Sequence, residues 1–218
     1  MIIAIDGPAA SGKSTTAKLV AEKLKITYLD TGAMYRALTL HLLKSNIDFN
    51  NVDKVSTILD NLSIEMYDYK GRNIIKLNNE DITEKIRSSN VTENVSAVSA
   101  LLIVRQSMVV MQRQIGNKTD CVVEGRDIGT IVFPNADYKF FMIADIKMRA
   151  NRRLNEMNQL GANKTYDEMV SDLEIRDYKD TNRDNSPLRK AVDAVEIDTT
   201  ELTIDEQVNK IINHIKNK

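Results

Sequence analysis

Residues 2–14 read IIAIDGPAASGKS, and this stretch decides the fold. An apolar run of strand length, Ile2–Asp6, leads directly into the pattern G-x-x-x-x-G-K-S, and a helix-like segment follows over 15–24. The glycines let the backbone wrap around phosphate oxygens, and the N–H groups at the helix start point at the anion. Lys13 can reach the β- and γ-phosphates, and the hydroxyl of Ser14 can ligate Mg²⁺. The sequence therefore predicts a phosphate loop that binds a nucleoside triphosphate.

The composition is that of an ordinary globular protein. With 218 residues, of which 28% are charged and 42% hydrophobic, the chain can form one large domain or one domain with insertions. A formal net charge of −1 argues against nucleic-acid or membrane-surface partners, because proteins that bind them are usually basic. We therefore expect a monomer with small-molecule partners, no nucleic acid and no membrane.

Cys121 is the only cysteine, so the chain cannot form an internal disulfide. Its neighbours Val122 and Val123 predict a buried strand, in which the thiol belongs to the core and is not a nucleophile. No apolar stretch is long enough to span a bilayer, and the N-terminal apolar run is too short for a signal peptide. His41 and His214 fall on expected helices, and no cysteine or histidine cluster indicates zinc. The expected location is the cytoplasm.

Five short runs are expected to form strands, and helical patterns separate most of them. The runs are Ile2–Asp6, Thr27–Leu29, Cys121–Glu124, Tyr138–Ile143 and Ala194–Asp198. This alternation predicts βαβ units, and therefore an α/β fold with a five-stranded parallel sheet flanked by helices. Each of the first three strands ends in a polar or glycine-bearing turn. Because ligands bind outside the carboxyl ends of such strands, the informative turns fall together at one edge of the sheet.

The segment over about 46–99 departs from this rhythm. Leu62–Tyr69 alternates with period two, Asn73–Asn78 does so more weakly, and residues 70–72 between them fit a hairpin turn. Glu80–Thr83 is expected to add a third short strand, since two strands alone would be marginal. The sequence thus predicts a small antiparallel insertion in a single unit over 1–218.

Two turns at the sheet edge carry candidate chemistry. Thr31 occupies the expected N-cap after the second strand, and Arg36 lies about a turn and a half into the following helix, where the two would hold a second anion. The third strand ends in EGRD (124–127), and a buried strand rarely ends in three charges for packing reasons. Arg126 can clamp a phosphate through two N–H groups, and Asp127 can accept hydrogen bonds from a base or from Mg²⁺-bound water.

Charged side chains are concentrated after the fourth strand. Arg149, Arg152 and Arg153 cluster on one expected helix, and Arg176, Asp180 and Arg183 share one face of the next. Gly161 is the expected break between the two helices. Charge runs on helices are usually solvated faces. Phosphoryl transfer, however, depends on positioning and on neutralising spread negative charge, so a chain with a phosphate loop and these arginines has the parts for it.

Two short strings imitate the signature of a GTPase. Asn117–Asp120 reads N-K-x-D, and Asp68–Gly71 reads D-x-x-G. In GTPases the N-K-x-D string follows a buried strand, whereas here it precedes the strand at Cys121, and Asp68 falls in the hairpin rather than beside the phosphate loop. Both strings are interpreted as chance matches, so a GTP-dependent switch is the less favoured class.

Taken together, these motifs resemble those of the bacterial cytidylate kinases, which are nucleoside monophosphate kinases, and the resemblance covers essentially the full length. Its most specific elements are Asp30–Arg36 (DTGAMYR), Glu124–Thr130 (EGRDIGT), and Arg176-Asp177 followed by Asp180 and Arg183. Bacterial members also resemble one another in carrying the hairpin insertion. The resemblance implies a P-loop kinase with a core over about 1–45, 100–150 and 169–218, a monophosphate-binding insertion over about 46–99, and a helical lid over about 151–168.

The resemblance also implies which residues bind ATP, Mg²⁺ and the acceptor, CMP or dCMP. The implied ATP contacts are Gly7, Pro8, Ala9, Ala10, Ser11, Gly12, Lys13, Ser14, Thr15 and Arg153, with Ser14 as the metal ligand. The implied acceptor contacts are Thr31, Tyr35, Arg36, Ser99, Arg105, Arg126, Asp127, Arg176, Asp180 and Arg183. The implied catalytic residues are Lys13, Arg126, Asp127, Arg152 and Arg183.

Within the acceptor set, the family pattern implies different tasks. Arg36, Arg126 and Thr31 would hold the phosphate, while Ser99, Arg105 and Asp127 would read the cytosine edge. Arg176 and Asp180 would contact the sugar, and Arg183 the phosphates or base. Arg152 and Arg153 look like lid arginines that close over ATP. The family usually has a proline between the serine and the arginine that read the base, whereas residues 99–105 here read SALLIVR, which predicts a continuous helix.

The implied reaction is in-line transfer of the γ-phosphoryl group of ATP to CMP or dCMP, which gives ADP and CDP or dCDP without a covalent intermediate. The residues alone leave two alternatives open. One is a kinase for another nucleoside monophosphate or a small metabolite on the same scaffold. The other is a nucleotide sensor without catalysis.

Overall fold

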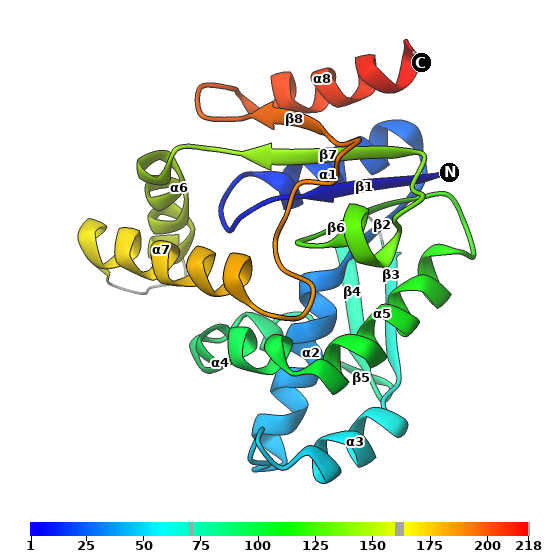
Figure 1. Cartoon of the computed structure of the whole chain (residues 1–218), viewed down its shortest axis with the longest axis vertical. Helices are drawn as coiled ribbons and strands as arrows, with labels where there is room; N and C mark the ends of the chain where they lie inside the picture. The colour runs from blue at the N-terminus through cyan, green and yellow to red at the C-terminus, as the bar shows by residue number, and fades with distance from the viewer. Residues whose placement is uncertain (70–71, 160–163, 218) are drawn as a thin grey trace.

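The architecture is a central sheet with helices on both faces and a small second sheet beside it (Figure 1). A computed structural model describes residues 1–69, 72–159 and 164–217. The central sheet has the strand order β2-β6-β1-β7-β8, and all of its neighbours pair in parallel. Its strands are β1 (Ile2–Asp6), β2 (Thr27–Asp30), β6 (Cys121–Gly125), β7 (Tyr138–Ile143) and β8 (Val195–Asp198). The predicted five-stranded parallel sheet is confirmed, with three strand ends shifted by one residue.

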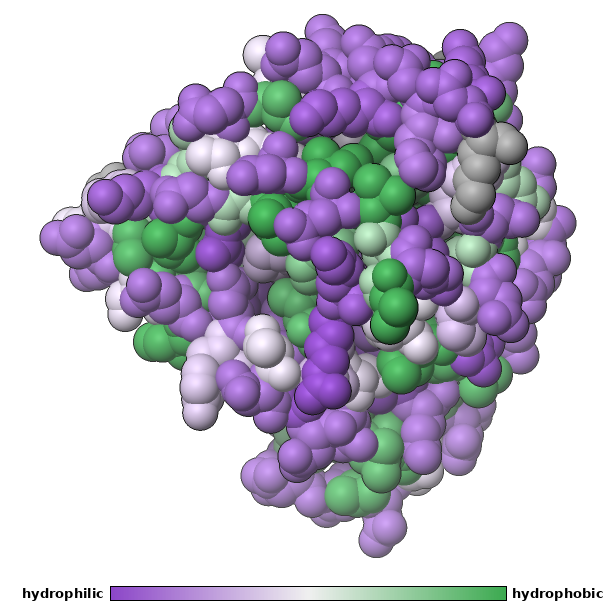
Figure 2. Space-filling model, turned by 45° about the horizontal axis from the view of Figure 1, so that its top comes forward, coloured by the Kyte–Doolittle hydropathy of each residue, from purple (hydrophilic) through white to green (hydrophobic). Residues whose placement is uncertain are grey.

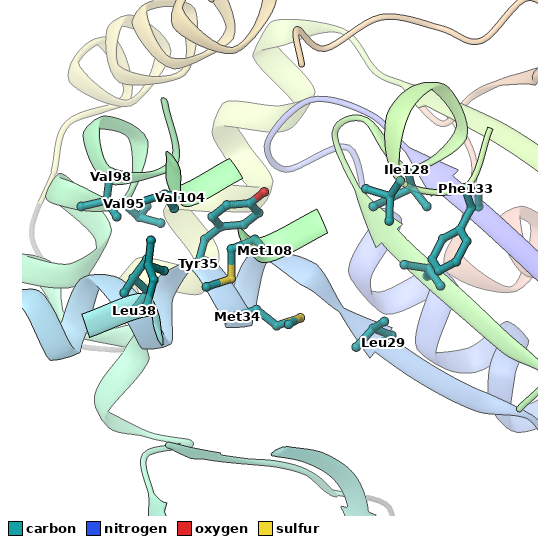
Figure 3. Close-up of a cluster of buried hydrophobic side chains, with 14 of the residues drawn as sticks. Leu29, Met34, Tyr35, Leu38, Val95, Val98, Val104, Met108, Ile128 and Phe133 are labelled. Carbon is teal, nitrogen blue, oxygen red and sulfur yellow. The ribbon is translucent and has the colours of Figure 1, made fainter. Parts of the chain in front are cut away.

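The helices are α1 (Lys13–Leu24), α2 (Thr31–Lys44), α3 (Val52–Asp60), α4 (Ser89–Ala100), α5 (Leu102–Gly116), α6 (Ile146–Gln159), α7 (Tyr166–Asn182) and α8 (Ile204–Lys216). Two groups of them pack on opposite faces of this sheet, while α6 and α7 share an apolar cluster of their own. Side chains alternate along β1, so Ile3 and Ile5 pack with α1 and α8, while Ala4 joins the cluster of α2, α4 and α5 (Figure 3). The strand that leads to the phosphate loop is therefore buried on both sides.

The register of the sheet brings three polar strand ends together. Asp30 on β2 pairs with Glu124 on β6, and Asp6 on β1 pairs with Gly125 of the same strand. Because parallel strands share one direction, the turns that follow β1, β2 and β6 lie at one edge, as the sequence predicts.

The insertion forms a second, antiparallel sheet. Its strands are β3 (Ile64–Tyr69), β4 (Arg72–Leu77) and the two-residue β5 (Glu80–Asp81). The predicted hairpin and its third strand are confirmed, while the predicted turn at Lys70 and Gly71 lies outside the described residues. Ile75, Leu77 and Ile82 bury against α2, which gives this small sheet the apolar support that a hairpin alone lacks.

The continuous helix expected over 99–105 is wrong. Helix α4 ends at Ala100, Leu101 adopts an extended conformation (φ −65°, ψ 126°), and α5 starts at an angle of 95° to α4. The bend buries Val98 on one side of the break and Val104 on the other in the same cluster. Packing of the two helices onto one core therefore overrides the local helical preference of the segment.

The single cysteine and the two histidines lie in the elements that the sequence predicts for them. Cys121 is buried, and burial raises the pKa of its thiol to about 11, so it is a core thiol as expected. His41 and His214 lie on α2 and α8, and no metal-binding cluster occurs among the described residues.

Of the helices described over 1–69, 72–159 and 164–217, none alone is long and apolar enough to cross a membrane; only the bent pair α4–α5 meets this criterion jointly. Gly161, the expected helix break, lies outside the described residues.

Candidate active site

A cleft of about 1100 Å³ opens at the carboxyl edge of the central sheet. The phosphate loop, the start of α2 and the end of β6 form its floor, and the hairpin, the α4–α5 junction and α7 form its walls. Hydrophilic side chains cover most of the face shown in Figure 2. Most residues of the two predicted binding sets line this one cleft; the exceptions are Gly7, Pro8 and Ser11, and Arg152 of the predicted catalytic set does not line it either.

The phosphate loop depends on two glycines. At Gly7 an added Cβ would lie 2.2 Å from the carbonyl oxygen of Met142, so only glycine lets the loop pass beside β7. Gly12 has a φ of 87°, which a side chain would strain, and it directly precedes α1. The free N–H groups at the start of α1 therefore face the cleft, where an anion can accept from them.

Lys13 is buried at the base of this loop. Its ammonium donates to the carbonyl oxygen of Pro8 at 3.1 Å. Burial, and next the positive charge of Arg126, lower the pKa of Lys13, while Glu124 opposes the shift. A phosphate that entered the loop would supply the negative charge that this ammonium lacks.

Glu124 accepts two side-chain hydrogen bonds at the end of β6. Ser14 Oγ donates to one carboxylate oxygen at 2.8 Å, and Tyr28 Oη donates to the other at 2.5 Å. Burial raises the pKa of Glu124, and the nearby carboxylate of Asp30 acts in the same direction. Glu124 and Tyr28 were not among the predicted site residues. For Glu124 the sequence offers one signal, a charged residue at the end of a buried strand. For Tyr28 the sequence offers no such signal.

The expected N-cap of α2 is wrong by one residue. Asp30 is the cap, and its carboxylate accepts from the backbone N–H of Ala33 at 2.9 Å. Thr31 is the first helical residue, and its hydroxyl donates to the carbonyl oxygen of Glu124 at 2.7 Å. A carboxylate also suits the positive end of the helix dipole, so Asp30 is the better cap. Both residues still line the cleft.

Asp127 and Arg105 form a buried ion pair at the far end of the cleft. Arg105 Nη2 lies 2.5 Å from Asp127 Oδ2, and Arg105 Nη1 donates to the carbonyl oxygen of Ser99 at 3.2 Å. The Tyr35 ring lies 5.3 Å from the Arg105 guanidinium. The bend between α4 and α5 brings this set together, because Ser99 and Arg105 lie on opposite sides of it. Ser96 also lines the cleft, although it was not predicted.

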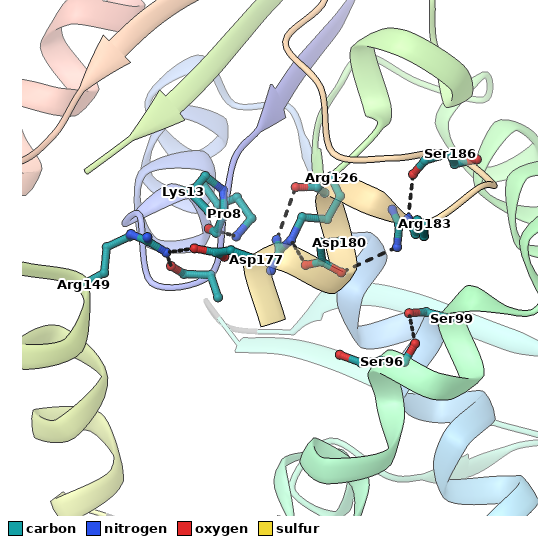
Figure 4. A network of polar contacts seen from close by, with 12 residues as sticks. Pro8, Lys13, Ser96, Ser99, Arg126, Arg149, Asp177, Asp180, Arg183 and Ser186 are labelled. Carbon is teal, nitrogen blue, oxygen red and sulfur yellow. Dashed lines mark hydrogen bonds and ion pairs between the residues drawn. The ribbon is translucent and has the colours of Figure 1, made fainter. Parts of the chain in front are cut away.

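Arg126, Asp180 and Arg183 form a second polar group, shown in Figure 4. Arg126 Nε donates to Asp180 Oδ2 at 2.9 Å, and Arg183 Nη1 lies 3.7 Å from Asp180 Oδ1. Burial alone would raise the pKa of Asp180, but Arg126 and Arg176 outweigh it and hold that pKa below its usual value. The predicted helical face of α7 thus connects to the turn after β6.

Three further arginines point their charge at the same space. Arg36 Nη1 donates to Thr92 Oγ1 at 3.1 Å, and Arg153 pairs with Glu156 at 2.9 Å. Arg176 Nε is buried and has no hydrogen-bond partner within the described part of the chain, and burial followed by repulsion from Arg126 lowers the pKa of Arg176 to about 9. All three line the cleft, which is therefore rich in cations that an anionic ligand would stabilise.

Arg152 is placed apart from the other predicted residues. Its guanidinium donates to the hydroxyl of Thr199 at 3.1 Å and to the carbonyl oxygen of the same residue at 2.6 Å. Thr199 Oγ1 in turn donates to the carbonyl oxygen of Ser11 at 2.9 Å. Arg149, which was not in the predicted site, pairs with Asp177 at 2.5 Å. The base of the α6–α7 pair thus contacts the outer side of the phosphate loop.

Comparison with known proteins identifies the family. A model of the cytidylate kinases matches residues 3–217. The chain belongs to the cytidylate kinase family. Proteins named cytidylate kinase are 51% identical to it over 215 residues in Clostridioides difficile, 47% over 216 in Fusobacterium nucleatum and 44% over 216 in Bacillus subtilis. The matches cover 99% of this chain and 98%, 97% and 96% of those proteins, respectively.

Solved structures support the fold of this cytidylate kinase family member. A shikimate kinase from Bacteroides thetaiotaomicron superposes with a TM-score of 0.52 at 12% identity, covering 99% of this chain and 98% of the other. An uncharacterized protein from Eubacterium ventriosum gives a TM-score of 0.51 at 14% identity, covering 100% and 99%. At such identities the likeness concerns the P-loop kinase fold alone. The resemblance inferred from the sequence motifs is confirmed.

Proposed function

We propose that this protein transfers the γ-phosphoryl group of ATP to CMP or dCMP, and that it releases ADP and CDP or dCDP. The observation that carries the proposal is the single cleft, with the phosphate loop at one end and the buried Asp127–Arg105 pair at the other. Arginines line the space between the two ends. This order suits a triphosphate and a nucleoside monophosphate that meet through their phosphates.

The ATP side consists of the phosphate loop and one lid arginine. Lys13 neutralises the β- and γ-phosphates, and the backbone N–H groups over residues 9–15 cradle them. Arg153 pairs with exposed Glu156, and it can exchange that carboxylate for a phosphate. Arg152 joins the phosphates when the lid closes, which requires it to leave Thr199.

The residues around Ser14 fit Mg²⁺. A hydroxyl and a carboxylate form a set of hard oxygen donors, and the Ser14–Glu124 contact of 2.8 Å places them together. The buried carboxylate, which faces Asp30 as well, also gains from a cation. Ser14 would hold the ion directly and Glu124 beside it. When bound, Mg²⁺ neutralises charge on the transferring phosphoryl group.

The acceptor side separates phosphate recognition from base recognition. Arg36, Arg126 and Thr31 hold the phosphate of CMP, and Arg126 exchanges Asp180 for it. Asp127 accepts a hydrogen bond from the exocyclic amine of cytosine, in a place already fixed by Arg105. Ser99 and Arg105 complete the base contacts, and Tyr35 packs beside them. The remaining contacts are Arg176 and Asp180 to the sugar and Arg183 to the phosphates or base.

The reaction needs no covalent intermediate. A phosphate oxygen of the acceptor attacks the γ-phosphorus in line, and ADP leaves while Lys13, Arg126 and Arg183 offset the spread charge. Alignment of the two substrates supplies up to roughly 7–11 kcal/mol of the barrier in ideal cases. Closure of the lid over about 151–168 onto the core, with the insertion over about 46–99 on the acceptor side, excludes water as a competing acceptor.

The test is ADP release from Mg²⁺-ATP in the presence of CMP, dCMP, UMP, AMP or no acceptor. We expect rapid release with CMP and dCMP, slower release with UMP, and almost none without an acceptor. Rapid release with AMP as acceptor, and not with CMP or dCMP, would indicate another kinase on the same scaffold. Equal release in every sample would indicate a simple NTPase and would contradict the acceptor site.

A further inference from the structure

We infer that Asp6 is a positioning residue for the acceptor nucleotide. Its carboxylate, at the end of the strand that leads into the phosphate loop, holds the segment that carries Arg126 and Asp127. The inference rests on the proposed acceptor site and adds to it a residue that contacts no substrate.

The carboxylate of Asp6 binds two adjacent backbone N–H groups. Oδ1 accepts from Ile128 and Oδ2 from Gly129, each at 2.8 Å. These are the first N–H groups of a short π-helical turn, Ile128–Val132, whose own hydrogen bonds run from later residues back to Asp127 and Ile128. Asp6 therefore caps this turn from another strand, 122 residues away in sequence.

The cap fixes the backbone on the far side of Asp127. On the near side, Gly125 is held by its pairing with Asp6 in the sheet. Between these two anchors the chain leaves the strand, and Asp127 has a non-helical conformation (φ −143°, ψ 24°) that turns its side chain to Arg105. One residue thus anchors both ends of the four-residue stretch that presents Arg126 and Asp127.

Burying an ionised carboxylate to cap a turn costs desolvation free energy. Asp6 is 4% exposed, and within the described residues it takes part in no ion pair, so its two backbone hydrogen bonds are the main compensation of its charge, with a smaller contribution from Arg126. Both oxygens are needed, because each accepts from a different N–H group. An amide of the same shape would turn an N–H₂ group toward one of these donors and leave it unsatisfied.

The experiment compares D6N with the matched variant D198N. Asp198 also ends a strand of the sheet, but a single oxygen accepts both of its hydrogen bonds from Thr200, so an amide can replace it. The binding of CMP, UMP and ATP is measured by calorimetry without Mg²⁺, together with the melting temperature and the kinetic constants. For D6N we expect the Kd and KM for CMP to rise roughly tenfold or more, with ATP binding within about twofold of wild type. D198N should match wild type.

Each outcome decides the inference. A D6N protein that melts earlier yet binds CMP as wild type does would show a structural role only and overturn the inference. Equal losses for CMP and ATP would overturn it as well. If wild type itself fails to bind CMP, the proposed function falls too, which distinguishes that failure from one confined to Asp6.

A second measurement covers the case that D6N does not fold. Hydrogen exchange of the Ile128 and Gly129 amides is followed in wild type, with and without CMP. We expect slow exchange that CMP slows further and that ATP leaves unchanged. Exchange at the rate of exposed loop amides, or no response to CMP, would overturn the inference.

Discussion

At the scale of single residues, the cleft is an arrangement of buried charges that satisfy one another without a ligand. Asp127 is paired with Arg105, Asp180 with Arg126, and Glu124 with two hydroxyl donors. Lys13, Arg36 and Arg176 are the exceptions, because burial lowers the pKa of each and no ion pair compensates them among the described residues. The consequences of removing a side chain therefore differ between paired and unpaired groups.

Replacement of Lys13 by alanine should lower turnover by about 10²–10³-fold or more, because the charge nearest the transferring group is lost. The melting temperature should stay near that of wild type, since the variant loses a buried cation that forms no ion pair with any described residue. Steady-state kinetics and thermal unfolding check the two parts. Turnover near that of wild type would contradict the role of Lys13.

Replacement of Asp127 by alanine should affect both stability and selectivity. The variant leaves Arg105 buried without its carboxylate partner, so we expect the free energy of unfolding to fall by about 3–5 kcal/mol. The preference for CMP over UMP should also fall, with little change in ATP affinity. The double variant D127A/R105M separates the effects: stability should recover, while the preference should not. An unchanged CMP to UMP ratio in D127A would remove Asp127 as the base reader.

At the scale of elements, function depends on how helices meet. Helices α6 and α7 have an apolar cluster of their own, which includes Ala150, Met169 and Leu173 and takes in Ala9 of the phosphate loop. The proposed lid is therefore packed onto the loop at its base. On the other side, the bend at Leu101 places Ser99 and Arg105 in one group.

The bend predicts that Leu102→Pro is tolerated. Leu102 is half-exposed and is the first residue of α5, where proline is favoured, and the extended Leu101 suits a residue that precedes proline. We expect stability to be unchanged or to rise by about 0.4–1 kcal/mol in chemical denaturation. Ser107→Pro, in the interior of the same helix, is the control and should cost about 3 kcal/mol or more. A comparable loss in both variants would show that the break needs a free N–H at Leu102.

At the scale of the whole molecule, the central sheet carries both proposed substrate sites on adjacent strands. β1 leads to the phosphate loop, and its neighbour β6 leads to the turn that holds the proposed acceptor contacts. Asp6 joins the two strands, and its charge makes global stability depend on pH. Burial raises the pKa of Asp6 to about 7; its N–H hydrogen bonds and Arg126 oppose this, while Asp127 reinforces it.

The pH dependence has a definite sign. The folded state holds the Asp6 proton more tightly than the unfolded state, whose carboxyl titrates near 3.8. Stability from this group is thus fully present below about pH 4 and is lost as pH rises to about 7. The difference in unfolding free energy between wild type and D6N should fall over this range when both are followed by denaturant titration. A difference that is flat with pH would contradict the raised pKa of Asp6.

Local patterns predicted much of the fold and many of the residues that line the candidate site. The strands were predictable because they are apolar runs between turn residues, and the site residues because they follow those runs or lie in recognisable motifs. Asp6 and Tyr28 could not be found this way, since their partners, Gly129 and Glu124, are remote in sequence. The break at Leu101 was missed because it arises from the packing of two helices on one core, which no window of seven residues records.

The pairing of Arg126 with Asp180 has a consequence for which anions the cleft retains. Because Arg126 already has a counter-ion, a phosphate that binds at this guanidinium must displace the carboxylate of Asp180. Free inorganic phosphate gains little from this exchange, because it replaces one anion by another. In the proposed complex, a nucleotide would offset this loss through its base at the Asp127 end of the cleft. The Arg126–Asp180 pair would thus make the proposed acceptor site select nucleotides over free phosphate.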